Sequence, residues 1–224
     1  MEDKKFTPEL LESLMASAVK DADLRSGEIP RIDLYIDQIL TLVSEKTAEA
    51  SDRYKDNLLT KTMINNYSKE GLIMPVKGKK YTKEHIIQML LIYSLKNSLS
   101  IGEIKRLIRG AYLEGFDGET LTRCYDRFVE IKGEERERAK SIAGDIIAGE
   151  ELCLDDSGDF FVALLSIMAC SAYLRSIAVE MLEARYPLPE DEKDKEKDKE
   201  KSKDKEKSKE RSKDKEKRTK EEDR

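Results

Sequence analysis

The chain has no tryptophan, one histidine and three cysteines among its 224 residues, and these scarcities exclude several kinds of chemistry. A single histidine, His85, cannot supply a histidine-rich metal site or a histidine-based acid–base pair. The cysteines, Cys124, Cys153 and Cys170, are odd in number and contain no CxxC pair, so neither a disulfide framework nor a zinc knuckle fits. No P-loop, HExxH or GxSxG motif occurs. We therefore expect no catalytic residues, no metal and no cofactor, that is, a protein that is not an enzyme.

Long apolar runs are scarce as well. The first residues are acidic and lack a long apolar core, which is unlike a signal peptide. The longest uncharged run, residues 160–174, has 15 residues and is diluted by Ser166, Cys170 and Ser171. A helix that spans a bilayer needs about 20 predominantly apolar residues. We therefore predict a cytoplasmic protein without a membrane segment.

Charge is abundant but unevenly distributed. Charged residues make up 40% of the chain, and residues 190–224 contain 16 basic and 15 acidic residues without one apolar side chain. Well-mixed opposite charges favour an expanded chain that has nothing to bury. Residues 187–224 are therefore predicted to be a disordered, low-complexity tail. Without the tail the chain is about 45% hydrophobic, which is ordinary for a globular protein.

Outside the tail, apolar residues recur at three- and four-residue steps, which is the spacing of α-helices. Thr82 and Ser100 stand where N-caps are expected. Glu103 completes a capping box with Ser100, and Gly71 is placed to stop a helix. Only residues 72–81 are typical of an extended turn. The sequence therefore predicts an all-α protein with, at most, a small wing. The predicted helices cover residues 8–19, 32–43, 60–70, 83–95, 101–111, 121–131 and 160–182, with a charged stretch after residue 131.

The body of the chain has one basic segment between two acidic ones. Residues 51–110 contain 12 basic and five acidic residues, a net charge of +7. Residues 1–50 have a net charge of −5, and residues 111–189 one of −8. Such asymmetry is expected where one module faces a polyphosphate and the remainder must avoid it. Chance clustering of charge is the alternative interpretation.

The basic segment has the order helix, turn, helix and basic hairpin, which is the order of a helix-turn-helix with a wing. Helix 60–70 has a small polar face that includes asparagine, the side chain best shaped to bond adenine in the major groove. The wing, residues 77–81, offers lysines to the flanking phosphates. We therefore predict double-stranded DNA as the partner. For Tyr67, packing into the core is an equally good interpretation. The predicted DNA contacts are Thr60, Lys61, Thr62, Asn65, Asn66, Tyr67, Lys69, Lys77, Lys79, Lys80 and Tyr81.

Residues 62–108 resemble the DNA-binding module of MerR-type transcription regulators. The matching features are a helix end, a stop, a proline, a basic wing and a following helix: Tyr67, Glu70-Gly71-Leu72, Pro75, Lys79, Lys80, Tyr81 and residues 99–108. The resemblance implies a dimer that reads a partly palindromic site, with Tyr67 near a phosphate. The MerR-type recognition helix usually has an Arg-Tyr pair where this chain has Asn65 and Asn66, so the family's base preference is not transferred.

A wider stretch, residues 28–180, is similar to a YkrK-like bacterial family of unknown function, which implies no activity. The chain then has four predicted parts. They are an N-terminal helix (1–27), a MerR-like winged helix-turn-helix module (28–114), a helical dimerisation or partner region (115–186) and the disordered tail (187–224).

The last predicted helix, residues 160–182, is apolar on almost every side. Such a helix has to be enclosed, either inside its own bundle or between two subunits. We favour a homodimer, because a DNA-reading dimer needs a shared surface of this kind. No cluster of polar groups identifies a small-molecule effector there. The predicted interface residues are Phe161, Leu164, Leu165, Met168, Leu174 and Ile177.

Several residues that could carry chemistry have simpler interpretations. His85 lies in the first turn of a helix and is expected to be structural. The cysteines are expected to be small buried hydrophobic residues. Asp155, Asp156 and Asp159 precede an apolar helix and are expected to cap it rather than to bind a cation. The leading alternative function is a helical protein–protein interaction module that keeps the helix-turn-helix shape without binding DNA.

Overall fold

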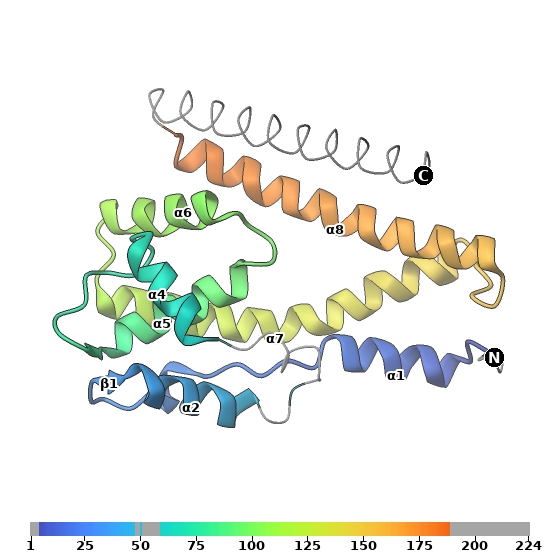
Figure 1. The fold of residues 1–224 in the computed structure, drawn as a ribbon. Coiled ribbons are helices and arrows are strands. Elements are labelled where there is room, and N and C mark those ends of the chain that lie inside the picture. The colour runs from blue at the N-terminus through green and yellow to red at the C-terminus, as the bar shows by residue number, and fades with distance from the viewer. Residues whose placement is uncertain (1–4, 48–49, 51–58, 189–224) are drawn as a thin grey trace, which may run out of the picture. The chain divides into compact units, whose positions relative to one another are not determined.

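Figure 1 shows the fold in a computed structural model, which describes residues 5–47, 50 and 59–188. The chain divides into two compact units, residues 1–180 and residues 181–224. Helices dominate the described residues, so the predicted all-α class is confirmed. From residue 189 onward, the predicted tail lies outside the described residues. The elements are α1 (Pro8–Ala18), the 3₁₀ helix η1 (Ser26–Glu28), β1 (Leu34–Tyr35), α2 (Ile36–Lys46), α4 (Lys61–Lys69), β2 (Lys80–Tyr81), α5 (Lys83–Leu95), α6 (Ile101–Leu113), α7 (Gly118–Gly149) and α8 (Ser157–Arg185).

One hydrophobic core lies within residues 24–129 and is built from α2, α4, α5, α6 and the first half of α7. Helix α5 is central to it, because residues 85–90 are all buried and α5 packs along α7. Ile86 and Ile92 on α5 and Ile64 on α4 are completely enclosed. Burying such a side chain contributes about 1.5–3 kcal/mol. The core therefore fixes α4 and the segment that follows it.

The helix ends follow the capping residues predicted from the sequence. Glu103 N donates a hydrogen bond to Ser100 Oγ at 3.2 Å, and Ser100 N donates one to the Glu103 carboxylate at 2.6 Å. Thr82 caps α5 in the same way. Gly71 follows α4 with a φ of +66°, the left-handed conformation that commonly ends a helix. These ends are set locally, because each cap satisfies backbone groups within one turn of itself.

The helix predicted over residues 32–43 begins too early. Helix α2 starts only at Ile36, because Leu34 and Tyr35 form strand β1, which pairs antiparallel with β2. The backbone bonds of the wing strand therefore go to a segment far earlier in the chain. Ile32 is consequently exposed rather than on the buried face of a helix.

The charged stretch after residue 131 does not interrupt the helix that precedes it. Helix α7 runs unbroken over 32 residues. The stretch contains no proline, and ion pairs one turn apart support it: Arg138 with Glu135 at 2.8 Å and Lys140 with Glu137 at 2.7 Å. The first half of α7 belongs to the core and the second half lies outside it.

The segment between α1 and η1 is tied to the middle of α7. Asp21 and Asp23 each form ion pairs with both Lys132 and Arg136. The Tyr125 hydroxyl donates a hydrogen bond to a backbone carbonyl of the same segment at 2.6 Å. Burial raises the pKa of Tyr125 above its usual value, so the hydroxyl remains a donor. These contacts join the N-terminal segment to the core.

Helix α8 is mostly exposed, so the prediction that its own bundle could enclose it is wrong. Phe161 and Met168 are 62% and 65% exposed, and Ala163 is the one residue of α8 up to residue 180 that is buried. By length and composition α8 is also able to cross a membrane, with a mean hydropathy of 1.8 over 18 residues. The count of uncharged residues missed this because the helix continues beyond Arg175.

Candidate nucleic-acid interface

Helix α4 has one apolar face and one polar face. Ile64 and Tyr67 are buried and lie on the apolar face. Thr60 caps the helix, since its Oγ1 accepts a hydrogen bond from Met63 N at 3.2 Å. Residues three and four positions apart share a helix face, so the exposed polar residues form one stripe. This stripe consists of Lys61, Thr62, Asn65, Asn66 and Lys69.

Tyr67 is not available for contact with DNA, which corrects its place among the predicted contacts. Its side chain is 5% exposed and belongs to the hydrophobic core. Burial raises the pKa of its hydroxyl. Of the two interpretations of Tyr67, packing into the core is the one that the structure shows.

The wing is short and is held against β1. In the β1–β2 pair Tyr35 lies opposite Lys80, and the Lys80 Nζ atom lies 5.2 Å from the centre of the Tyr35 ring. This is a cation–π contact, which restrains the lysine. Lys77 and Lys79 are exposed, and neither forms an ion pair with another residue that the structure describes. The wing therefore presents two lysines to solvent and one against an aromatic ring.

His85 holds the C-terminal end of the wing in place. Thr82 N donates a hydrogen bond to His85 Nδ1 at 3.1 Å, and the Thr82 hydroxyl lies 2.7 Å from the same nitrogen. The Tyr81 ring meets the His85 ring edge-on, with the centroids 6.1 Å apart. His85 is itself buried. These contacts give His85 the structural role that the sequence predicts.

The polar face of α4 and the wing meet at the start of α2. Lys61 Nζ lies 3.5 Å from Asp37 Oδ1. Asp37 follows Tyr35 by two positions, and the Tyr35 ring contacts Lys80. Residues 61–83 contain six lysines and one acidic residue. Lysines from two separate elements are thus brought to one corner of the fold. Sequence reasoning missed Tyr35 because it placed this residue inside a helix rather than in strand β1. It missed Asp37 because the contact with Lys61 joins residues far apart in the chain.

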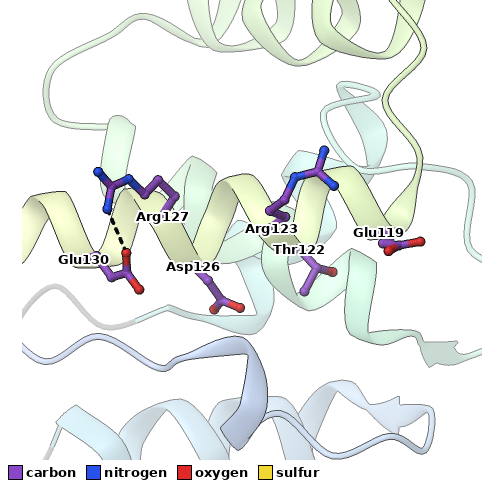
Figure 2. A pocket seen from close by; sticks show the side chains of 6 residues that line it. All are labelled: Glu119, Thr122, Arg123, Asp126, Arg127 and Glu130. Carbon is purple, nitrogen blue, oxygen red and sulfur yellow. Dashed lines mark hydrogen bonds and ion pairs between the residues drawn. The ribbon is translucent and has the colours of Figure 1, made fainter.

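A concave region lies along the first half of α7 and is drawn in Figure 2. Arg127 pairs with Glu130 at 3.1 Å, and Asp126 accepts hydrogen bonds from the backbone N and the hydroxyl of Ser26 at 3.0 and 2.5 Å. Basic and acidic side chains alternate here, so the region does not concentrate one sign of charge. We interpret it as a solvated helix face. Its lining residues are Glu119, Thr122, Arg123, Asp126, Arg127 and Glu130.

The remaining candidate groups do not form a site. Cys124 and Cys153 are exposed, which corrects the prediction that they are buried, and Cys170 is half-buried. Of the three predicted capping aspartates, Asp156 caps α8, since its carboxylate accepts hydrogen bonds from Gly158 N at 2.8 Å and from the next backbone N at 3.0 Å. Within the described ranges, no group of three or more His, Cys, Asp or Glu residues is placed to hold a metal ion.

Residues 24–128 match the model of a protein family described as Domain of unknown function (DUF1836). The matched segment nearly coincides with residues 24–129, which build the hydrophobic core, and it contains both α4 and the wing. The chain matches no curated protein and no solved structure. Because the family description assigns no activity, the function has to be inferred from the residues themselves.

Proposed function

We propose that the chain is a DNA-binding transcription regulator of the MerR-like winged helix-turn-helix type, and that it is not an enzyme. The observation that carries this proposal is the exposed polar stripe of α4 beside the lysines of the wing, in a chain whose net charge is −5. A local positive surface attracts a polyanionic partner, and the acidic remainder of the protein repels that partner elsewhere.

Helix α4 is the element that enters the major groove. It has nine residues, a length of about 13 Å, which suits a recognition helix laid in the groove. Asn65 and Asn66 lie near the middle of the stripe, where bidentate bonds to adenine N6 and N7 are within reach. Lys61 and Lys69, at the two ends of the stripe, contact the phosphates on either side.

The wing contacts the adjacent phosphate backbone. Lys77 and Lys79 are exposed and form no ion pair with a described residue, so neither has to break an existing contact to bind a phosphate. Lys80 first has to leave the Tyr35 ring. We therefore expect Lys79 to contribute more than Lys80 to affinity and expect neither to discriminate between sequences.

Anisotropy of labelled duplexes at several salt concentrations tests the wing. Lys79→Ala is expected to weaken binding to every duplex and to lower the slope of log K against log salt by about 0.9 per subunit. Lys20→Ala, which removes an exposed lysine outside the interface, is the control and leaves the slope unchanged. If the folded wild-type protein shows no salt-dependent binding, the proposal is wrong. The alternative, a protein–protein interaction module that keeps the helix-turn-helix shape, then takes its place.

Base readout is tested on a duplex selected from a random pool. Asn65→Ala is expected to cost about 1–3 kcal/mol on the selected duplex and much less on unselected ones. An equal loss on all duplexes would contradict the role that we give to Asn65. The same selection with Asn66→Ala shows which asparagine reads which position.

We also propose that two copies of the chain pair through α8 and that the dimer is cytoplasmic. Large exposed apolar patches on soluble proteins commonly mark interfaces, and a second α8 has matching chemistry. Pairing would bring two α4 helices to one duplex, as a partly palindromic site requires. All the predicted interface residues are exposed: Phe161, Leu164, Leu165, Met168, Leu174 and Ile177.

Light scattering after size exclusion tests the pairing. Met168→Glu is expected to give monomers with an unchanged helix signal, since it places a charge in the proposed interface. Ile32→Glu, which alters an equally exposed apolar residue away from α8, is expected to remain dimeric. A monomeric wild-type protein would contradict the dimer. Cosedimentation of the wild-type protein with liposomes would contradict the cytoplasmic location and assign α8 to a membrane.

A further inference from the structure

A hollow of about 780 Å³ lies between the second half of α4, the turn that follows it and the end of α6. It borders the candidate DNA contacts Asn65 and Tyr81 but reaches behind them to α6. Hollows of about 300–1,000 Å³ with apolar walls and a few placed polar groups are typical of small-molecule sites. The apolar side chains of its wall are Leu72, Ile73, Met74, Pro75, Val76, Ile108 and Leu113.

The floor of this hollow carries an oriented hydroxyl. Gln88 is 1% exposed, its Oε1 accepts a hydrogen bond from Met74 N at 3.0 Å, and its Nε2 donates one to the Tyr112 hydroxyl at 2.7 Å. The Tyr112 oxygen is thus an acceptor for Gln88, which leaves its own proton to be donated elsewhere; no described residue accepts it. Burial raises the pKa of Tyr112, so the proton remains in place at neutral pH.

The rim of the hollow carries a cation. Arg109 lies three residues before Tyr112 on α6, so both side chains are on one helix face. Arg109 is exposed and forms no ion pair with the residues that the structure describes. Leu113, which also lines the hollow, is 85% exposed and adds apolar surface to its wall. A cation, a hydroxyl donor and uncovered apolar surface therefore lie together.

We propose that this hollow binds a small organic carboxylate with an aromatic or aliphatic body. Arg109 pairs with the carboxylate, Tyr112 donates a hydrogen bond to it, and the apolar body covers the wall. A DNA phosphate could meet Arg109 equally well, but it would leave the apolar wall uncovered. The charge and the apolar area together select an amphipathic anion.

Occupation of the hollow changes the DNA interface, and this step rests on the proposed function. The same hollow is lined by Asn65 on α4 and by Gly78 in the wing, and the turn between them is tied to Gln88 through Met74 N. A ligand wedged there alters the spacing of α4 and wing, so it alters affinity for DNA.

Isothermal titration of the full-length protein without DNA tests the site itself. The probes are phenylacetate, octanoate and benzoate, each beside its neutral amide. At least one acid is expected to bind saturably with one molecule per chain, and Arg109→Gln is expected to weaken it about tenfold or more. The affinity of the neutral amide for the wild-type protein is expected to be no higher than the affinity of the acid for Arg109→Gln. Arg127→Gln, which removes an exposed arginine from α7, is the matched control and leaves binding unchanged.

Two outcomes overturn the proposal: none of the three acids binds, or the acid binds wild type and Arg109→Gln equally. Tyr112→Phe adds a second check, since it keeps the wall and removes only the hydroxyl, and it is expected to weaken the acid severalfold. Addition of the acid to a protein–DNA mixture is a separate measurement. If the acid binds but DNA affinity is unchanged, the site stands and the coupling fails. If the acid binds and no DNA binds, the proposed function fails independently.

Discussion

Replacing Lys132 by methionine tests whether ion pairs hold the N-terminal segment on α7. Lys132 pairs with Asp21 and with Asp23, the latter at 2.6 Å, and Arg136 pairs with both aspartates at 2.5 and 2.6 Å. The Asp21 side chain is 4% exposed and that of Lys132 is 26% exposed. The replacement leaves two carboxylates, that of Asp21 buried and that of Asp23 partly buried, facing one cation.

The size of the loss follows from this geometry. Removing one partner of a fully buried pair costs about 3–5 kcal/mol, whereas an exposed pair contributes about 0–1 kcal/mol. Lys132 is partly exposed and Arg136 remains on Asp21, so we expect a loss of about 2 kcal/mol in the free energy of unfolding. Arg138→Met is the matched control, because it removes a cation from the same helix whose side chain is 66% exposed. We expect it to cost at most about 0.5 kcal/mol.

Urea unfolding followed by far-ultraviolet circular dichroism measures both variants. A loss for Lys132→Met no larger than that for Arg138→Met would refute the reasoning, because it would mean that the buried cluster contributes no more than a surface pair. Equal slopes against urea are needed for the comparison, since a changed slope signals a change in the exposed area rather than in stability alone.

Acidification provides an independent check on the same cluster. Burial alone would raise the pKa of Asp21, but hydrogen bonds and charge from Lys132 and Arg136 outweigh it and hold the pKa below its ordinary value. The contribution of Asp21 is therefore fully present above its unfolded pKa of about 3.9 and is lost as the pH falls toward the lower folded pKa. The stability difference between wild type and Lys132→Met should shrink below about pH 4. A difference that stays constant down to about pH 2 would be inconsistent with this assignment.

Four further substitutions test the fold by the same unfolding measurement. Gly71→Ala is expected to lower the free energy of unfolding by about 1–2 kcal/mol through its positive φ alone, since a Cβ there meets no atom. Gly144→Ala inside α7 is expected to raise it by about 0.5–1 kcal/mol. A gain for both variants would rule out strain at Gly71. Ser100→Ala removes the cap of α6 and is expected to cost about 1 kcal/mol, so an unchanged midpoint would show that Glu103 alone suffices. Ile64→Ala is expected to cost about 2–5 kcal/mol, and a loss below about 1 kcal/mol would contradict its complete enclosure.

The features that could be predicted from the sequence are those determined within one or two helical turns. Helix α4, its glycine stop and the capping box at Ser100 follow from residues that contact one another locally. Strand β1 could not be predicted in this way, because Tyr35 becomes a strand residue only through its distant partner Lys80. The ambiguity at Tyr67 was likewise resolved by packing against other elements, which the spacing of residues in one helix does not reveal.

The hollow behind the interface could not be predicted from the sequence for the same reason. Gln88 and Tyr112 come from two helices and are joined by a hydrogen bond across a long stretch of sequence, and Arg109 lines the same hollow. The available signal was the three-residue spacing of Arg109 and Tyr112 on one helix face. Sequence reasoning instead weighted residues 61–81, where basic residues cluster. It therefore found the lysine-rich surface and missed the hollow beside it.

The unbroken course of α7 has a mechanical consequence. Beyond Arg136, the last residue tied to the N-terminal segment, the helix continues for 13 residues to Gly149, a rod of about 20 Å. A tilt of about 10° at Arg136 displaces the far end by about 3.5 Å, because a helix without a break transmits rotation along its length. A tilt of α7 in the core would therefore move the turn that leads into α8 further than it moves the end of the helix that packs on α5.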